Sequence, residues 1–131
     1  MPYRQRLIIE GGGCRKNLDS RSFALGFMEK LSEALGMRIL VPPVVVRVPI
    51  SAAAKSLCTI DQGVTGFVIW MESGAQIHTW PNENLVTLDA YSCKKFKVSV
   101  ALGLFQEAFN PMEIHFASPD PSRHGEKRGV S

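Results

Sequence analysis

Long apolar runs, an excess of one charge and cysteine pairs with metal-ligand spacing are all missing from this chain of 131 residues. No stretch reaches the roughly 18 apolar residues that a membrane-spanning helix needs. Lysine and arginine exceed aspartate and glutamate by a net charge of only +3, and they are scattered along the chain. Composition therefore indicates neither a nucleic acid nor a membrane as a partner.

Secretion signals and disulfide frameworks are also lacking. The first residues, MPYRQRLIIEGGG, contain too short an apolar stretch for a signal peptide. The 3 cysteines are an odd number, and their spacing matches no metal site. Reduced thiols are typical of the cytoplasm, so we expect a cytoplasmic protein that binds no metal.

The length and the 45% hydrophobic content predict one globular domain. Periodicity and turn residues predict two amphipathic helices and several strands. The first helix starts at Asp19 or Ser20 and stops at Gly36, and the second starts near Phe96 and ends at Asn110. The predicted strands cover residues 6–10, 38–50 as two short strands or one bent edge strand, 64–71, 75–80, 85–92 and 112–117.

This order of elements favours an α+β fold, a two-layer sandwich of an antiparallel sheet with both helices on one face. The other sheet face would stay bare, and a second copy of the chain could cover it in a four-layer αββα dimer. We expect a single domain over residues 1–117. The last residues, 118–131, are polar and contain prolines and glycines, so we expect a flexible tail.

Residues 63–93, GVTGFVIWMESGAQIHTWPNENLVTLDAYSC, combine residue types that matter chemically. Glu72-Ser73 is followed by His78 five residues after the serine, and by Cys93 twenty residues after it. This pattern resembles the small, prokaryotic type of S-adenosylmethionine decarboxylase, whose segments read G-V-S-G, E-S-H, I-H-T-W-P-E and D-x-x-x-C. The serine, the histidine and the cysteine keep the spacing of that family.

The resemblance implies a proenzyme that cuts its own Glu72-Ser73 bond and converts Ser73 into a pyruvoyl group. That carbonyl forms a Schiff base with the substrate amine and takes up electrons during decarboxylation, as pyridoxal phosphate does, so neither pyridoxal phosphate nor a metal is expected. His78 is the candidate base, because imidazole is partly neutral at cytoplasmic pH. Thr65 replaces the serine that positions this histidine in the family. Cys93 is the candidate proton donor to the product.

The same family implies a homodimer with active sites near the dimer interface, and a role in spermidine synthesis. Its substrate contacts are less well kept than its cleavage residues. Asn82 stands where the family has a glutamate that binds ribose, and Glu83 is one position further along. The family also has an aromatic residue that stacks on adenine shortly before its G-V-S-G segment, and here no aromatic residue lies just before Gly63. Trp80 remains as a stacking surface. The segment 38–62 is longer than the family leads us to expect.

Three functions stay open at this point. The first is decarboxylation of S-adenosylmethionine. The second is pyruvoyl-dependent decarboxylation of a smaller basic amino acid, ornithine or arginine, with Asp61 or Glu83 meeting the distal cation. The third is a paralogue without catalysis, against which the retained Ser73, His78 and Cys93 count. Ser73 and His78 point to opposite faces of a regular strand, so for them to meet we expect the chain to be broken or cleaved near Gly74.

Overall fold

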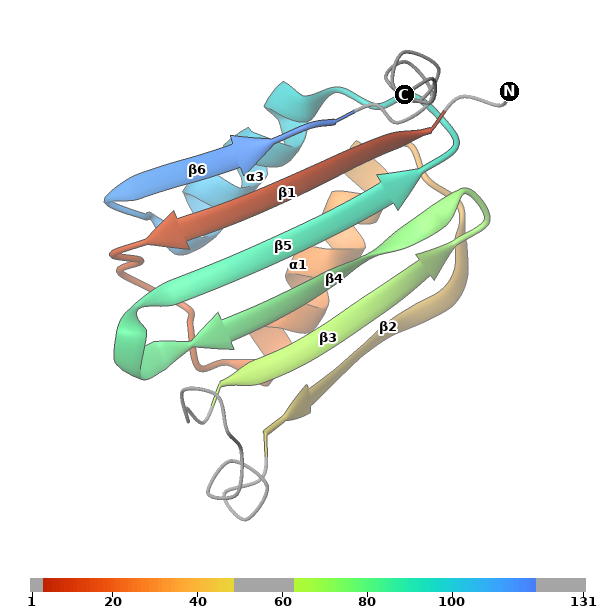
Figure 1. The fold of residues 1–131 in the computed structure, drawn as a ribbon. Helices are drawn as coiled ribbons and strands as arrows, with labels where there is room; N and C mark the ends of the chain where they lie inside the picture. Colours follow the sequence, from red (N-terminus) through yellow and green to blue (C-terminus); the bar gives the residue numbers. More distant parts are fainter. Residues whose placement is uncertain (1–3, 49–62, 120–131) are drawn as a thin grey trace, which may run out of the picture.

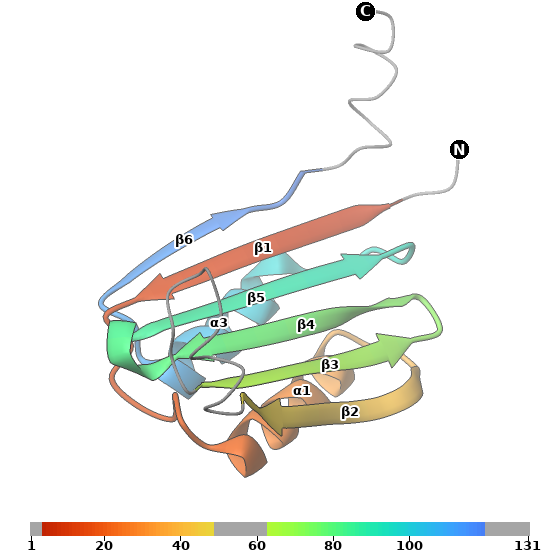
Figure 2. The same ribbon diagram turned by 60° about the horizontal axis from the view of Figure 1, so that its bottom comes forward.

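The computed structural model describes residues 4–48 and 63–119. Within them the chain forms one six-stranded sheet in the order β2-β3-β4-β5-β1-β6. All five neighbouring pairs are antiparallel. Helices α1 and α3 lie on one side of this sheet in both views (Figures 1 and 2). The predicted α+β fold with both helices on one face is therefore confirmed.

The first strand and the first helix follow their sequence signals closely. Strand β1, Gln5–Gly12, alternates buried and exposed positions, with Leu7 and Ile9 inside. Helix α1, Arg21–Ala34, is capped by Ser20, whose hydroxyl accepts the N–H of Phe23 at 3.0 Å. Gly36 follows the helix with a φ of 73°, the left-handed conformation that favours glycine after a helix end.

Strand β2, Ile39–Arg47, is a single irregular strand at one edge of the sheet. Its pairing with β3 shifts register twice, between Ile39 and Val41 and between Val41 and Val44. Pro42 and Pro43 lie in the second shift, where the lack of an amide N–H interrupts the ladder. The expectation of one bent edge strand is thereby borne out over the described part of 38–50, whereas residues 49–62, with Asp61 and Cys58, lie outside the described residues.

Three consecutive strands form the middle of the sheet. They are β3, Val64–Trp70, β4, Ser73–Trp80, and β5, Leu85–Ser92. Strand β4 begins two residues earlier than predicted, because Ser73 already pairs with Trp70 and Ser92. A short 3-10 helix, η1 (Pro81–Glu83), and Asn84 with a φ of 53° form the predicted turn into β5.

Helix α3, Val98–Phe109, ends at Asn110, whose φ is 46°. Strand β6, Glu113–Ala117, then pairs with β1 at the second edge of the sheet. Phe105 and Phe109 of α3 are fully buried, and Phe27 of α1 meets Phe109 with ring centroids 5.3 Å apart. Truncating such a buried aromatic side chain costs about 3–5 kcal/mol, so this helix layer carries much of the core.

The sheet face opposite the helices is uncovered within the described residues. It carries apolar side chains that are 36–52% exposed. They are Ile8, Val44, Val46, Phe67 and Ile69. A contiguous exposed apolar surface of this kind is typical of an interaction site. Among the described residues no helix is both long and apolar enough to cross a membrane.

Candidate active site

The Glu72-Ser73 bond lies in the tight connection between β3 and β4. Ser73 is the first residue of β4 and has a φ of 147°. This conformation is essentially reserved for glycine, and a residue with a side chain held there costs on the order of 1–3 kcal/mol. The bond that the sequence marks for cleavage is therefore backbone-strained.

The carbonyl of Glu72 has a fixed donor. Its oxygen accepts the backbone N–H of Cys93 at 3.0 Å, immediately after β5 ends at Ser92. The Ser92 hydroxyl holds this end in place, since it accepts the Lys94 N–H at 2.8 Å and donates to the Lys94 carbonyl at 2.7 Å. An N–H aimed at a carbonyl oxygen stabilises the negative charge that develops there when the carbon is attacked. Cys93 itself is exposed.

We call Glu72, Ser73 and Cys93 the cleavage cluster. Two residues that sequence reasoning missed support it, Ser92 and Arg38. The Arg38 backbone N–H and Nε–H both donate to the Glu72 carboxylate, at 3.1 and 2.9 Å. Arg38 precedes β2 and is distant from Glu72 in sequence, so no local spacing could have revealed this contact.

His78 lies in the second half of β4 and is held at both ring nitrogens. Thr65 of β3, directly across the ladder, places its hydroxyl 3.0 Å from Nδ1. The amide nitrogen of Gln76 lies 2.6 Å from Nε2. Trp80 stacks on the ring with centroids 5.7 Å apart. The predicted Thr65–His78 hydrogen bond is present, and we call Thr65, Gln76, His78 and Trp80 the histidine cluster.

Gln76 was missed by sequence reasoning, although a signal existed. Residues two apart in a strand share a face, so Gln76 and Trp80 both flank His78. With the amide oriented as it is, its N–H donates to Nε2, and Nδ1–H donates to the Thr65 hydroxyl. Burial of the ring lowers the pKa of His78 and the Asp89 carboxylate partly opposes this, so the neutral imidazole is favoured.

The two clusters do not meet within one chain. Ser73 pairs with Trp70, whereas His78 pairs with Thr65, and the ladder between them is continuous. Five residues of strand separate Ser73 and His78 by about 16 Å, at ~3.3 Å per residue. The uncleaved chain therefore has no break near Gly74, and cleavage there stays a prediction. Gly74 is not in the left-handed region, and a side chain there would come within 2.5 Å of the Val68 carbonyl oxygen, which explains the glycine.

The candidate substrate residues lie at the histidine end of β4. Trp80 is its last residue, and Asn82 and Glu83 follow in η1, both exposed. None of the three is near Ser73 in the same chain, because η1 lies beyond His78 along the strand. The candidate Asp61 lies outside the described residues.

A shallow hollow of about 610 Å³ on the bare sheet face reaches Ser73. Its charged lining residues are Arg6 and Asp89, and Arg6 lies over the Tyr91 ring at 4.3 Å. Another cavity, of about 430 Å³, lies between α1 and α3 and includes none of the candidate site residues. Within residues 4–48 and 63–119 no group of three or more histidine, cysteine or acidic side chains is placed to hold a metal ion.

The chain is similar to known proteins in sequence and in fold. The sequence profile of the family described as S-adenosylmethionine decarboxylase matches residues 5–120. An S-adenosylmethionine decarboxylase proenzyme of Archaeoglobus fulgidus is 50% identical over 50 residues, which are 37% of this chain and 45% of that protein. A proenzyme of the same name from Clostridium botulinum, strain Loch Maree, is 30% identical over 91 residues, which are 68% of this chain and 67% of that one.

Among solved structures, the adenosylmethionine decarboxylase of Aquifex aeolicus superposes with a TM-score of 0.73. The superposition covers 91% of this chain and 90% of that one at 19% identity, and it therefore supports the fold. The profile match extends through both helices and all six strands described above. Together with the clostridial relative, it shows that this chain belongs to the S-adenosylmethionine decarboxylase family.

Proposed function

We propose that this chain is a self-processing proenzyme that becomes a pyruvoyl-dependent decarboxylase, with S-adenosylmethionine as substrate and a place in spermidine synthesis. Membership of the family places it among the carboxy-lyases. The observation that carries the proposal is the strained Ser73, next to a carbonyl that accepts the Cys93 N–H. A residue with a side chain in a regular strand does not adopt such a φ, whereas the N–H to carbonyl bond supplies the donor that the cleavage step needs.

Cleavage between residues 72 and 73 follows from simple chemistry at these atoms. The Ser73 Oγ adds to the Glu72 carbonyl carbon, the C–N bond breaks and the hydroxyl proton passes to the released nitrogen, so the peptide becomes an ester. The Cys93 N–H stabilises the oxyanion of this step. A base then removes the Ser73 α-proton, and the main-chain carboxylate of Glu72 leaves as the new C-terminus. The remaining dehydroalanine takes up water and releases ammonia, which generates the pyruvoyl end.

Once formed, the pyruvoyl group supplies a carbonyl that takes up the electron pair freed when carbon dioxide leaves. The residues around Ser73 suit it, because the serine already lines a hollow open to a substrate. Cys93, exposed beside it, is the proposed proton donor to the product. No metal takes part in this proposal.

His78 is the proposed base, and it has to come from a second copy of the chain. It lies about 16 Å from Ser73 along an unbroken strand, at ~3.3 Å per residue. A twofold axis running across the strands, between two bare faces, reverses the strand direction. It would bring the histidine cluster of one protomer to the cleavage cluster of the other. The exposed Ile8, Phe67 and Ile69 would then be buried between the sheets.

This homodimer also explains where the substrate residues lie. Trp80, Asn82 and Glu83 would approach Ser73 from the partner subunit, together with its His78. The single domain of residues 1–117 would be complete in each protomer, but each active site would need two protomers. The polar tail, residues 118–131, has no part in the proposed chemistry.

A second substrate class is favoured by one observation. Asp89 is a carboxylate in the hollow that reaches Ser73, and it could hold the distal cation of ornithine or arginine. Asn82 points the same way, because losing a charge-assisted hydrogen bond to ribose costs about 1.5–3 kcal/mol. We retain S-adenosylmethionine as the first candidate because the relatives carry that name.

The test begins with the intact mass of purified protein. Wild type should give two chains, the downstream one with a blocked amino terminus, and Ser73→Ala should stay at 14.5 kDa. Carbon dioxide release is then measured with S-adenosylmethionine, ornithine, arginine and lysine at equal concentration. Turnover of a basic amino acid alone would replace the first substrate with the second. A wild-type chain that stays whole after long incubation would contradict the proposal.

A further inference from the structure

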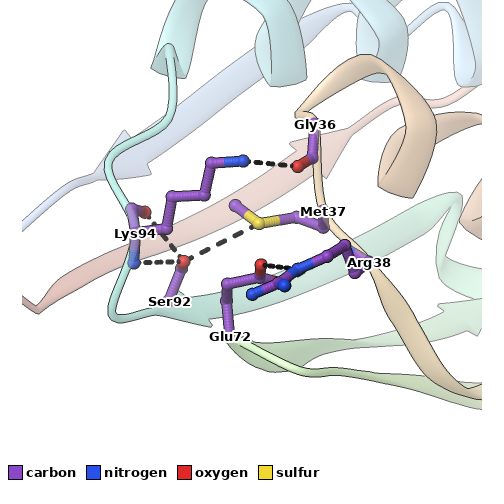
Figure 3. Close-up of polar contacts among 6 residues, drawn as sticks. All are labelled: Gly36, Met37, Arg38, Glu72, Ser92 and Lys94. Carbon is purple, nitrogen blue, oxygen red and sulfur yellow. Dashed lines mark hydrogen bonds and ion pairs between the residues drawn. The ribbon is translucent and has the colours of Figure 1, made fainter.

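The side chain of Glu72, the residue before the proposed cleavage point, is buried although it is a carboxylate. It is 5% exposed. A buried carboxylate needs hydrogen-bond partners, because the charged form is otherwise strongly destabilised. Arg38 supplies them from its backbone N–H and its guanidinium, at 3.1 and 2.9 Å (Figure 3). These hydrogen bonds lower the pKa of Glu72 and keep it ionised.

Arg38 also holds the backbone of the same turn. Its carbonyl oxygen accepts the N–H of Met71 at 2.8 Å. Three hydrogen bonds therefore connect one residue to the two positions just before Ser73. The Glu72 carboxylate is buried, whereas the Arg38 side chain is largely exposed, and two of the three bonds are made by the backbone of Arg38.

Residues 36–38, which connect α1 to β2, also contact the turn that carries the Cys93 N–H. The Gly36 carbonyl oxygen accepts the Lys94 Nζ at 2.6 Å, and the Met37 sulfur lies 3.8 Å from the Ser92 hydroxyl (Figure 3). Residues 36–38 thus contact both turns, the one with the Glu72-Ser73 bond and the one with the Cys93 N–H. They fix the distance between the carbonyl and its donor.

The strained backbone of Ser73 explains why the contact between Arg38 and Glu72 matters. A residue at a φ of 147° relaxes unless its neighbours on both sides are held. On the downstream side, pairing with Trp70 and Ser92 holds Ser73 itself. On the upstream side, Glu72 is held by Arg38. Without the Arg38 guanidinium, the Glu72 carboxylate would keep only the Arg38 backbone N–H as donor, and the turn could relax and move the carbonyl away from both the Ser73 hydroxyl and the Cys93 N–H.

We propose that Arg38 is a positioning residue for self-cleavage, which fixes the Glu72 carboxylate and so keeps the Glu72-Ser73 peptide in its strained, reactive geometry. The inference rests on the proposed cleavage at this bond. Arg38 touches neither the attacking hydroxyl nor the substrate hollow. It should therefore affect the rate of cleavage and leave turnover by cleaved enzyme unchanged.

The test follows cleavage from the moment of synthesis. Full-length chains are made by cell-free translation, quenched at timed points and weighed by mass spectrometry. Arg38→Ala should lower the rate constant of cleavage tenfold or more, and Arg38→Lys should recover part of it, because an ammonium can still reach the carboxylate. Arg47→Ala is the matched control, since it removes the same charge and an ion pair with Asp19 at the other end of β2, and it should stay within twofold of wild type.

Folding is controlled separately. In a Ser73→Ala background, which cannot cleave, Arg38→Ala and Arg47→Ala should melt within a few degrees of each other. If Arg38→Ala folds poorly, Glu72→Gln provides a second arm, because it removes the charge and keeps the shape. The double variant Arg38→Lys/Glu72→Gln should then cleave no more slowly than the slower of the two single variants. Such non-additivity is expected of two groups that act through one contact.

The outcomes separate the inference from the function on which it rests. A wild type that cleaves beside an equally fast Arg38→Ala overturns the role of Arg38 alone. Additive rate losses in Arg38→Lys and Glu72→Gln overturn it as well. A wild type that never cleaves overturns self-cleavage, and the inference with it.

Discussion

Ser73 of the cleavage cluster and His78 of the histidine cluster lie on the same strand, β4, but the two clusters are built in opposite ways. The cleavage cluster lies where strands end, with a strained Ser73 and hydrogen bonds from the irregular segments around Arg38 and Cys93. The histidine cluster lies within regular β-ladder, where Thr65 faces His78 directly. The first can store strain and the second can only hold a ring in place.

This difference suggests that one cluster supplies the bond that is cut and the other supplies the base. A regular sheet cannot bend to bring residues five apart together, because its ladder fixes their separation. In the proposed dimer the histidine cluster therefore acts on the cleavage cluster of the other copy. Each protomer would be both the substrate of cleavage and the source of the base for its partner.

The largest effect is expected from separating the two clusters by mutation. His78→Ala alone should stall at the ester, which hydroxylamine would cut, and Ser73→Ala alone should stay whole. When both variants are made together with distinguishable tags, the His78→Ala chain should be cleaved, because its Ser73 meets the His78 of the partner subunit. Gel analysis of the two tags gives the answer.

The mixed sample needs one control. Variants mixed after folding under conditions that prevent subunit exchange should show no rescue. Normal cleavage by His78→Ala on its own would mean that another base acts, and the comparison between the two clusters would lose its meaning.

A smaller effect should distinguish the backbone from the side chain at Cys93. Cys93→Ala keeps the N–H that donates to the Glu72 carbonyl, so cleavage should proceed within a few-fold of wild type. Turnover of substrate should fall, because the thiol is the proposed proton donor. Cys93→Pro removes the N–H, and loss of one oxyanion donor costs a factor of about 10²–10³.

Melting curves in a Ser73→Ala background would check that the proline variant is folded. If Cys93→Ala cleaved as slowly as Cys93→Pro, the thiol and not the amide would assist cleavage. The cleavage cluster would then depend on a side chain that the structure leaves exposed.

The smallest effect concerns pH and the histidine cluster. Burial lowers the pKa of His78, so the imidazole stays neutral when the pH falls below about 6.5, the ordinary pKa of histidine. Wild-type cleavage should therefore persist below that pH and be lost only as the ring protonates. Gln76→Glu places a carboxylate beside Nε2, which should raise the pKa and move this loss to higher pH.

Gln76→Leu is the control for this experiment, because it removes the hydrogen bond and adds no charge. It should slow cleavage about 2- to 10-fold, the range for one hydrogen bond of ~0.5–1.5 kcal/mol, with little shift in the pH midpoint. Rates of cleavage between pH 5 and 8, measured by intact mass, would show both effects. An unchanged midpoint in Gln76→Glu would mean that Nε2 faces away from residue 76 in the dimer.

Much of the molecule followed from the sequence alone. Local sequence predicted β1 and β5, a cap at Asp19 or Ser20 and a stop at Gly36 bounded α1, and the motif predicted the family, because each of these depends on residues close together in the chain. Sequence also indicated the Thr65–His78 contact, although only through the family pattern.

Tertiary structure decided the rest. It showed that β4 is continuous, because the ladder partners Thr65 to Trp70 and Ser92 hold it from both sides. It placed Arg38 against Glu72 across 34 residues, and the Cys93 N–H against the Glu72 carbonyl. Such contacts depend on how strands and helices pack, which no local pattern encodes. The sequence therefore determined which residues are candidates for the chemistry, and the fold decided which of them can meet within one chain.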